Sequence, residues 1–260
     1  MLINQRVYLA SFFRNITSIG TTRSISVPVT KTVTNAAAKR AEKTAAAEST
    51  LETELKEFTM DHIATSLQIT EEVFNEVDYI TDLINTELPL MLRAKLDEET
   101  WSTISGATGV NTQDIQIASG AVMEGYADIA RAANKVRTGC GEEPSVCLLS
   151  PSTFLEVFLK QLTASSAIID PSVAIRPNVL GLPVYQPLGL FSELGTADAK
   201  VGLVAHVNRW NRFWTEEGMT IERGMVNNDF LEWKTRYRAG IRTSFLMIQP
   251  KAFTVLEDGR

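Results

Sequence analysis

Few residues in this chain have the types and spacing that enzymatic chemistry needs. His62 and His206 are the only two histidines. The motifs G-x-S-x-G, G-x-x-x-x-G-K-[ST], G-x-G-x-x-G and H-E-x-x-H, which mark nucleophiles, phosphate loops and zinc sites, are absent. A lone histidine in a strand-like stretch is most often structural, so we expect no catalytic residue, no cofactor and no metal ion. An enzyme whose site is assembled from distant residues would leave no local trace and stays an alternative.

The cysteines and the acidic clusters give no stronger signal. Cys140 and Cys147 lack the C-x-x-C spacing of redox and zinc sites and are too few for a disulfide framework. We interpret them as reduced thiols, which favours synthesis in the cytosol. The acidic clusters at 97–99 and 142–143 have no nucleophile or metal-ligand set beside them. They are interpreted as solvated helix or loop faces.

The charge of the chain is divided unevenly along its length. The 260 residues are 44% hydrophobic, enough to bury a sizeable core, and no apolar run approaches the roughly 20 residues that cross a bilayer. Six basic residues and no acid precede Glu42, whereas 19 basic and 31 acidic residues follow. This asymmetry predicts a basic arm that lies across the acidic body of a neighbouring copy. A solvated basic tail and a transit peptide are the alternatives.

The stretch after Arg23 predicts a long hairpin. Residues 24–30, SISVPVT, alternate apolar and polar side chains as a half-buried strand does, and Pro28 suggests a sheet edge. Shorter alternations within 55–70 predict the returning strand, with the alanine-rich stretch 34–52 near the tip. Local propensity at the tip favours helix instead. Because a two-stranded hairpin is marginally stable alone, this hairpin needs a partner surface.

From Thr70 the hydrophobic period changes to that of a helix. Apolar residues recur at three-to-four-residue steps up to about Ile104, with Thr70 as a candidate N-cap. The face comprises Val73, Val77, Ile80, Ile84, Leu88, Met91 or Leu92, and Leu96. Pro89 predicts a kink or a break about one turn upstream. Gly106 and Gly109 are expected to end the helix.

The rest of the chain predicts a compact α/β unit and a long basic strand. Residues 121–136 and 151–164 are helical in pattern, with Ser150 or Ser152 as N-cap of the second helix, and short strands are expected at 145–150, 179–187 and 201–207. Residues 232–245 alternate apolar side chains, from Trp233 to Ile241, with lysine and arginine. We expect this basic face to pair with carboxylates of the long helix or of another subunit. Nucleic-acid binding is the alternative, without a motif to support it.

In this order, the parts resemble the major capsid protein family of tailed double-stranded-DNA bacteriophages. SVPVT followed by AAAKRAEKTAAAES is similar to the family's extended loop, and QITEEVFNEVDYITDLINTELPLMLRAKLDEETW to its spine helix. CLLSPSTFLEVFLK resembles its strand followed by a P-x-T helix, and VLGLPVYQP resembles its LLG-x-PV turn. Residues 218–256, with Pro250, Ala252 and Phe253, resemble the closing region. The resemblance covers the chain from about Arg23.

The resemblance implies an α+β fold with an axial α/β domain, a peripheral domain on a long helix and long strands, an extended loop and an N-terminal arm. The expected divisions are 1–23 (arm), 24–70 (loop hairpin), 71–120 (peripheral, with the spine helix), 121–206 (axial), 207–249 (peripheral long strands) and 250–260 (strand returning to the axial domain). The loop tip would lie over an adjacent subunit. The residues expected at subunit interfaces are Lys39, Arg40, Lys43 and Glu48 of the loop, Arg6 and Arg14 of the arm, and Arg236 and Arg238 of the long strand.

The function implied is self-assembly into hexamers and pentamers of an icosahedral shell that encloses double-stranded DNA without sequence-specific binding. The resemblance also implies a scaffolding protein, a portal and a decoration protein as partners, no membrane, a place in the virion and assembly in the host cytoplasm. An encapsulin-type compartment shares the fold and is the alternative. Family members often carry Trp at the loop tip, whereas Lys39 and Arg40 stand here, so we expect a salt-sensitive contact. A covalent link from Lys39 or Lys43 to Asn227 or Asn228 is not expected. The chain begins at the arm, which suggests a separate scaffolding protein or a mature form.

Overall fold

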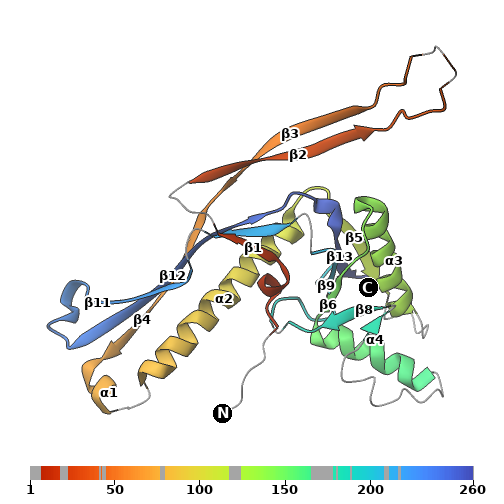
Figure 1. The fold of residues 1–260 in the computed structure, drawn as a ribbon. Helices are drawn as coiled ribbons and strands as arrows, with labels where there is room; N and C mark the ends of the chain where they lie inside the picture. Colours follow the sequence, from red (N-terminus) through yellow and green to blue (C-terminus); the bar gives the residue numbers. More distant parts are fainter. Residues whose placement is uncertain are drawn as a thin grey trace.

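A computed structural model describes residues 7–17, 23–40, 42, 45–76, 80–116, 124–164, 178–179, 181–187, 189–207, 211–215 and 218–259. The described residues form one long mixed sheet, one six-stranded sheet and a separate two-stranded hairpin. Figure 1 shows the hairpin projecting well beyond the two sheets, which lie side by side with the longest helix crossing between them.

The hairpin consists of β2 (Ser24–Thr34) and β3 (Thr50–Thr59), paired antiparallel from Ser24 opposite Thr59 to Thr34 opposite Thr50. The described residues of its tip, 35–40, 42 and 45–49, contain no helix. The helix that local propensity favours at the tip is therefore not formed in these residues. The expectation that the returning strand stays in the hairpin as far as residue 70 is wrong. The chain leaves the hairpin at Met60, because the alternating apolar residues that follow find a buried partner elsewhere.

The long sheet is built around β12 (Lys234–Leu246). One edge of β12 pairs with β4 (Asp61–Thr70) along ten residues, from Lys234 opposite Thr70 to Thr243 opposite Asp61. The other edge pairs with β11 (Thr220–Gly224) and then β10 (Arg212–Thr215), both antiparallel. The predicted long strand is therefore confirmed as the centre of a sheet.

The long helix is α2 (Ile80–Gly106), preceded by the short α1 (Glu71–Glu76). The ribbon of α2 continues through Pro89, so the break predicted one turn upstream is wrong (Figure 1). The packing of neighbouring side chains holds the helix together despite the hydrogen bond that proline cannot donate. The predicted end at Gly106 is confirmed.

The apolar stripe of α2 covers one face of the long sheet. Ile84, Leu88 and Leu92 are at most 1% exposed and form a cluster with Tyr237 and Ala239 of β12. Of the two alternatives for the stripe, Leu92 is buried, whereas Met91 is 49% exposed. Because side chains alternate along a strand, the arginines of β12 face away from this helix.

The six-stranded sheet forms the second core. Its order is β5 (Asn111–Ile115), β13 (Phe253–Asp258), β9 (Lys200–Ala205), β6 (Val146–Leu149), β8 (Leu182–Tyr185) and β7 (Asn178–Val179). On one face it packs against α3 (Glu124–Cys140) and α4 (Pro151–Ala164). The Ser150 hydroxyl accepts the backbone N–H of Thr153 at 3.2 Å, so Ser150 is the N-cap of α4. Residues 111–115 pair with β13, so they belong to this sheet and not to the long one.

The other face of the six-stranded sheet is covered by the start of the chain. Leu9, in the short helix η1 (Leu9–Phe12), is fully buried, and Phe13 is 6% exposed. Both pack with Ile104 of α2 and Phe253 of β13. The next strand, β1 (Arg14–Thr17), pairs parallel with β10. Residues 7–17 are thus anchored in their own molecule by their apolar side chains, and a contact of the arm with a neighbouring copy stays a prediction.

Candidate assembly surfaces

The projecting hairpin exposes apolar side chains to solvent. Leu51 and Leu55 of β3 are 65% and 72% exposed and share one face of the hairpin, with Pro28 of β2 opposite Leu55. On the other face Ile25 lies opposite Phe58, and the Lys56 ammonium lies 5.3 Å from the centre of the Phe58 ring. An isolated two-stranded hairpin is marginally stable in water, so this exposed face is a candidate contact with another molecule.

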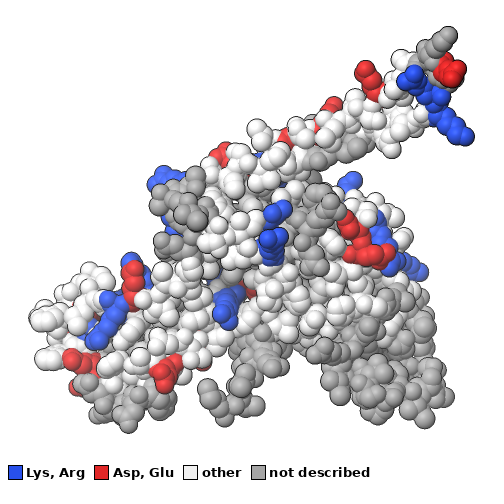
Figure 2. Space-filling model, in the orientation of Figure 1, with Lys and Arg blue, Asp and Glu red and all other residues white. Residues whose placement is uncertain are grey.

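The tip of the hairpin carries exposed charges of both signs. Lys39, Arg40 and Glu48 are exposed, and Figure 2 shows lysine and arginine gathered at the far end of the hairpin. In the described part of the chain, Lys39 and Arg40 have no ion-pair partner. The backbone beside them is held locally, because Ala36 N–H donates to Ser49 Oγ at 3.1 Å. The fourth predicted loop residue, Lys43, lies outside the described residues.

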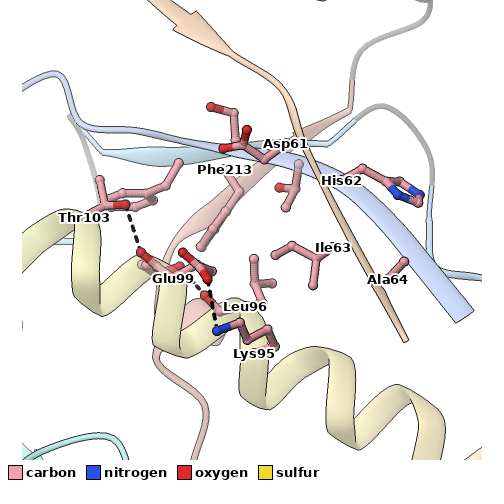
Figure 3. Close-up of a pocket in the computed structure, with 13 residues that line it drawn as sticks. Asp61, His62, Ile63, Ala64, Lys95, Leu96, Glu99, Thr103 and Phe213 are labelled. Carbon is pink, nitrogen blue, oxygen red and sulfur yellow. Dashed lines mark hydrogen bonds and ion pairs between the residues drawn. The ribbon is translucent and has the colours of Figure 1, made fainter. Parts of the chain in front are cut away.

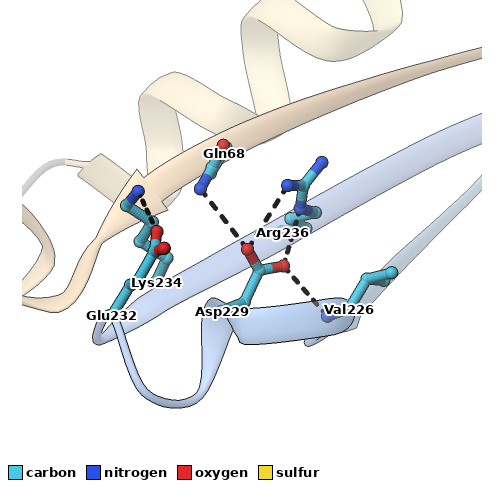
Figure 4. Close-up of polar contacts among 6 residues, drawn as sticks. All are labelled: Gln68, Val226, Asp229, Glu232, Lys234 and Arg236. Atoms are coloured by element: carbon cyan, nitrogen blue, oxygen red, sulfur yellow. Dashed lines mark hydrogen bonds and ion pairs between the residues drawn. The ribbon is translucent and has the colours of Figure 1, made fainter.

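The arginines of β12 find carboxylates within their own chain. Arg236 donates to Asp229 from Nε at 2.6 Å and from the guanidinium NH2 at 3.3 Å, and Arg238 pairs with Glu222 of β11 (Figure 4 shows the first of these contacts). The partners lie neither on the long helix nor on another subunit, so the predicted source of the carboxylates is wrong. The reason is local: β11 places Glu222 opposite Arg238, and the turn before β12 places Asp229 beside Arg236. A role of Arg236 and Arg238 at an interface stays a prediction.

Asp229 organises the turn that precedes β12. Its side chain is 4% exposed, and besides Arg236 it accepts the Val226 N–H at 2.9 Å and the Gln68 side-chain amide at 3.4 Å (Figure 4). The hydrogen bond from Arg236, followed by that from Val226, lowers the pKa of the Asp229 carboxyl below its ordinary value. The turn is thus fixed to β4 and β12 by one carboxylate.

Of the two predicted arm residues, the structure describes only Arg14. Arg14 is exposed at the start of β1, opposite Arg212 of β10, and Arg6 lies outside the described residues. Their role at an interface stays a prediction.

Asp97 is a buried structural residue that the sequence interpretation missed. Its carboxylate accepts the backbone N–H groups of Leu9 and Ala10, both at 2.8 Å, and it is 6% exposed. Burial raises the pKa of Asp97 to about 6, although the two hydrogen bonds act in the opposite direction. The solvated face expected at this position is therefore wrong. A sequence signal for this burial was the spacing of Asp97, Thr100 and Ile104, which places the three side chains on one face of a helix. All three are buried in the structure.

The second acidic cluster and the histidines have structural positions. Glu143 pairs with Arg137 at 2.6 Å, and its backbone oxygen lies 2.6 Å from His206 Nδ1. Cys147 is fully buried, which raises the pKa of its thiol to about 12 and makes it unreactive, and Cys140 is half-buried at the end of α3.

An exposed apolar surface at the end of the long sheet was also missed. We call it the distal patch: Met225, Val226, Phe230, Leu231 and Trp233, which are 52%, 52%, 74%, 75% and 69% exposed. Trp233 was predicted to begin the apolar side of the strand that continues to Ile241, but it lies outside the strand. It lies one residue before β12 with φ of 52°, a backbone region that bulky residues seldom adopt. The clustering of large apolar residues around Asn227 and Asn228 is the signal that could have revealed the patch.

A cavity of about 530 Å³ lies between β4, α2 and the C-terminal part of β12. Lys95 and Glu99 of α2 form an ion pair at 3.1 Å inside it, and His62 points away from that pair (Figure 3). Among residues that the structure describes, no group of three or more His, Cys, Asp or Glu could hold a metal ion, and no helix is long and apolar enough to cross a membrane.

Solved structures with the same architecture cover almost the whole chain. The chain of Microbacterium phage Oxtober96 superposes with a TM-score of 0.72 at 16% identity, over 98% of this chain and 93% of that one. The capsid structure of cyanophage P-SCSP1u gives 0.71 at 11% identity, over 100% and 90%. A virus-like particle from Pyrococcus furiosus gives 0.66 at 11% identity, over 98% and 93%.

At the level of sequence, no protein-family model and no curated protein matches. The structural likeness nevertheless extends over the hairpin, the long sheet and the six-stranded sheet together, because it spans the full chain. This chain has the phage major-capsid fold.

Proposed function

We propose that this chain is a major capsid protein that assembles with copies of itself into a closed shell around double-stranded DNA. The observation that carries the proposal is the hairpin, which projects from a chain with the phage capsid fold and exposes Leu51 and Leu55 together with Lys39 and Arg40, for which the described residues supply no ion-pair partner. These groups have no use in a monomer. A neighbouring copy would supply the burial that the hairpin lacks.

In this proposal the mechanism is binding and not chemistry. Each subunit would contact several neighbours, so many modest interfaces add up through multivalency, and closed symmetry limits growth. The six-stranded sheet with α3 and α4 would form the axial part that meets its copies at the centre of hexamers and pentamers. The long sheet with α2 would form the peripheral part. No residue is assigned a catalytic role.

The proposed function also implies other molecules and a place. The net charge of −6 suits a wall that encloses the DNA polyanion without gripping it in a sequence-specific manner. A scaffolding protein and a portal would take part in assembly, and a decoration protein could bind outside. The protein would be assembled in the host cytoplasm and reside in the virion.

Size-exclusion chromatography with negative-stain microscopy of the purified full chain tests the proposal. We expect capsomer-sized or larger species that form closed particles. A stable monomer or dimer under all assembly conditions would contradict it. The content of particles isolated from infected or expressing cells separates two kinds of shell: DNA supports a phage head, whereas a protein cargo would favour the encapsulin-type compartment.

A further inference from the structure

We propose that residues 7–17 form a strap that holds the long sheet and the six-stranded sheet against each other, and that the Asp97 carboxyl is a pH-dependent latch for this strap. The inference concerns the folded single subunit and does not rest on the proposed function. It follows from the contacts of the strap with both sheets, from the two hydrogen bonds that Asp97 accepts and from a hollow beside them.

The strap contacts both sheets at the place where they meet. The centre of the Phe13 ring lies 5.9 Å from that of Phe213 and 4.9 Å from that of Phe245, both in the long sheet. It also lies 6.0 Å from the ring centre of Phe253 in the six-stranded sheet. Leu9 is fully buried in the same cluster, and β1 adds an edge strand to the long sheet through β10. Figure 1 shows the start of the chain between α2 and the strands of the six-stranded sheet, so a movement of the strap changes contacts of both sheets.

Asp97 of α2 holds the first part of the strap. Its two carboxylate oxygens accept the backbone N–H groups of Leu9 and Ala10, both at 2.8 Å. The hydrogen bonds that Ser11 and Phe13 donate end on carbonyl groups of the strap itself. Among the described residues, Asp97 is therefore the one hydrogen-bond partner that the rest of the subunit gives to 7–13. Opening of the strap breaks both of these bonds at once.

A hollow of about 440 Å³ lies beside the latch. Its lining includes Val7 and Tyr8 of the strap, Met91 and Asp97 of α2, and Leu190. The Tyr8 hydroxyl is buried and has no hydrogen-bond partner among the described residues. A buried hydroxyl without a partner and a buried carboxylate are both unfavourable, and both would be hydrated if the strap moved away. Apolar burial therefore holds the strap closed against two polar groups that favour its release.

The protonation of Asp97 changes this balance. Burial raises the pKa of its carboxyl to about 6, although the hydrogen bonds from Ala10 and Leu9 act in the opposite direction. In an open strap the carboxyl would be solvated, with a pKa near the ordinary value of about 3.9. The closed strap therefore binds the proton more tightly than the open strap. As the pH rises from 4 to above 6, opening becomes more favourable by up to about 100-fold, since two pKa units correspond to that factor.

Other ionisable groups near the latch do not replace this response. In the elements packed around it, they are Arg93, Lys95, Glu98 and Glu99 of α2 and Tyr8 and Arg14 of the strap. Lys95 pairs with Glu98 at 3.0 Å and with Glu99 at 3.1 Å, so its charge is already offset. Arg93 and Arg14 are exposed, and the described residues of the turn at 187–190 are uncharged. The pKa of the latch is thus set by burial and by two backbone N–H groups.

Hydrogen exchange of the unassembled full-length chain tests the latch. Asp97→Asn keeps the shape of the side chain but cannot ionise. The exchange protection of the Leu9 and Ala10 amides is measured in the wild type and in this variant at each pH, and the ratio of the two cancels the intrinsic pH dependence of exchange. We expect the ratio of wild type to variant to fall by about 30- to 100-fold between pH 4 and pH 7.5.

Asp128→Asn is the matched control for the loss of a buried carboxylate. Asp128 is 1% exposed and, like Asp97, accepts a backbone N–H, that of Gln116 at 3.0 Å. It lies on α3, away from the strap. The protection of the strap amides in Asp128→Asn should therefore follow the same pH profile as in the wild type.

The distance between the two sheets tests the strap itself. In a Cys140→Ser background, where the remaining Cys147 is buried and unreactive, spin labels are placed at Leu155→Cys on α4 and at Phe230→Cys at the end of the long sheet. The distribution of distances between the labels should be narrow at pH 4.5 and broader at pH 7.5. With Asp97→Asn added, the distribution should be the same at both pH values.

The possible outcomes are distinct. A protection ratio that does not change with pH would overturn the latch. If the amides of β9 lose protection together with those of Leu9 and Ala10, the strap opens only when the whole subunit unfolds, which would overturn it as well. A pH-dependent ratio with an unchanged distance distribution would overturn the role of the strap between the sheets. Because both measurements use the unassembled subunit, a failure to form particles would contradict the proposed function and leave this test unaffected.

Discussion

Asp97 links the start of the chain to the long helix through a buried charge. The carboxylate receives two backbone hydrogen bonds at 2.8 Å, yet burial raises its pKa to about 6, above the roughly 3.9 of an unfolded chain. The folded state therefore binds this proton more tightly than the unfolded state. The contribution of Asp97 to the free energy of unfolding is greatest below about pH 4 and falls as the pH rises to about 6 and beyond.

Replacing Asp97 with Asn should remove this pH dependence. Between pH 4 and pH 7.5, the wild-type free energy of unfolding should fall relative to that of Asp97→Asn by about 2–3 kcal/mol, since a shift of about two pKa units corresponds to that amount. Urea unfolding of both full-length chains across this range measures the difference. If the free energies of unfolding of the wild type and Asp97→Asn change with pH in the same way, the interpretation of Asp97 as a buried charge is contradicted.

Leu9 and Leu55 provide a matched pair of leucines with opposite environments. Leu9 is fully buried between the six-stranded sheet and α2, so Leu9→Ala should lower the free energy of unfolding by about 2–5 kcal/mol through the cavity it leaves. Leu55 is 72% exposed, so Leu55→Ala should change it by about 0.5 kcal/mol or less. Chemical denaturation of the unassembled subunit measures the free energy of unfolding of both variants. If both substitutions lower it by the same small amount, residues 7–17 are not part of the core.

The hairpin should matter for assembly but not for the stability of the rest of the subunit. Its strands make contacts mainly with each other, so deletion of residues 34–52 should leave a folded subunit with a near-unchanged melting temperature. The same deletion should abolish closed particles. Circular dichroism and negative-stain microscopy give the two readings, and normal particles from the deletion variant would refute the role of the hairpin in assembly.

The charges of the tip offer a second test of the hairpin. Lys39→Glu with Arg40→Glu should reduce particle yield at low ionic strength by tenfold or more, and less at high ionic strength, because salt screens exposed charges. Light scattering during assembly at several salt concentrations measures this. An unchanged yield in the double reversal would exclude an electrostatic contact at the tip.

Periodic elements could be predicted from the sequence, whereas their pairing could not. The alternation in 232–245 predicts β12, and the helical stripe up to Ile104 predicts α2. Each prediction is possible because the apolar residues recur with the period of the face that is buried. The division of 55–70 between the hairpin and the long sheet depends on which distant strand pairs with it. Residues 61–70 pair with β12, which lies more than 160 residues away in the sequence. The sequence of 55–70 itself contains no pattern that indicates this partner.

The errors at single positions have a common physical cause. Asp97, Trp233 and the segment 7–17 were interpreted from charge or from strand period, whereas tertiary contacts determine their burial. The apolar residues of 7–17 outweigh the basic character of the region, so this segment packs inward. At the candidate interface, the basic tip and the hairpin follow from the sequence. The clustering of apolar residues that forms the distal patch is visible in the sequence, whereas their exposure depends on a turn that Asp229 and Arg236 hold in place.

For the whole molecule, two packed cores carry one projecting element and one exposed apolar end (Figure 1). Both cores are complete within one chain, so the subunit can fold before it assembles. The hairpin and the distal patch leave large apolar side chains exposed in the single chain. A shell of such subunits would be held by surfaces that stay exposed until neighbours arrive.

A three-dimensional reconstruction of particles formed by the purified full-length chain tests the central claim most directly. We predict a closed shell of repeated copies in which each hairpin lies on an adjacent subunit, with Leu51 and Leu55 covered by it. A chain that remains monomeric at high concentration, or particles whose hairpins extend into solvent without touching a neighbour, would contradict the claim.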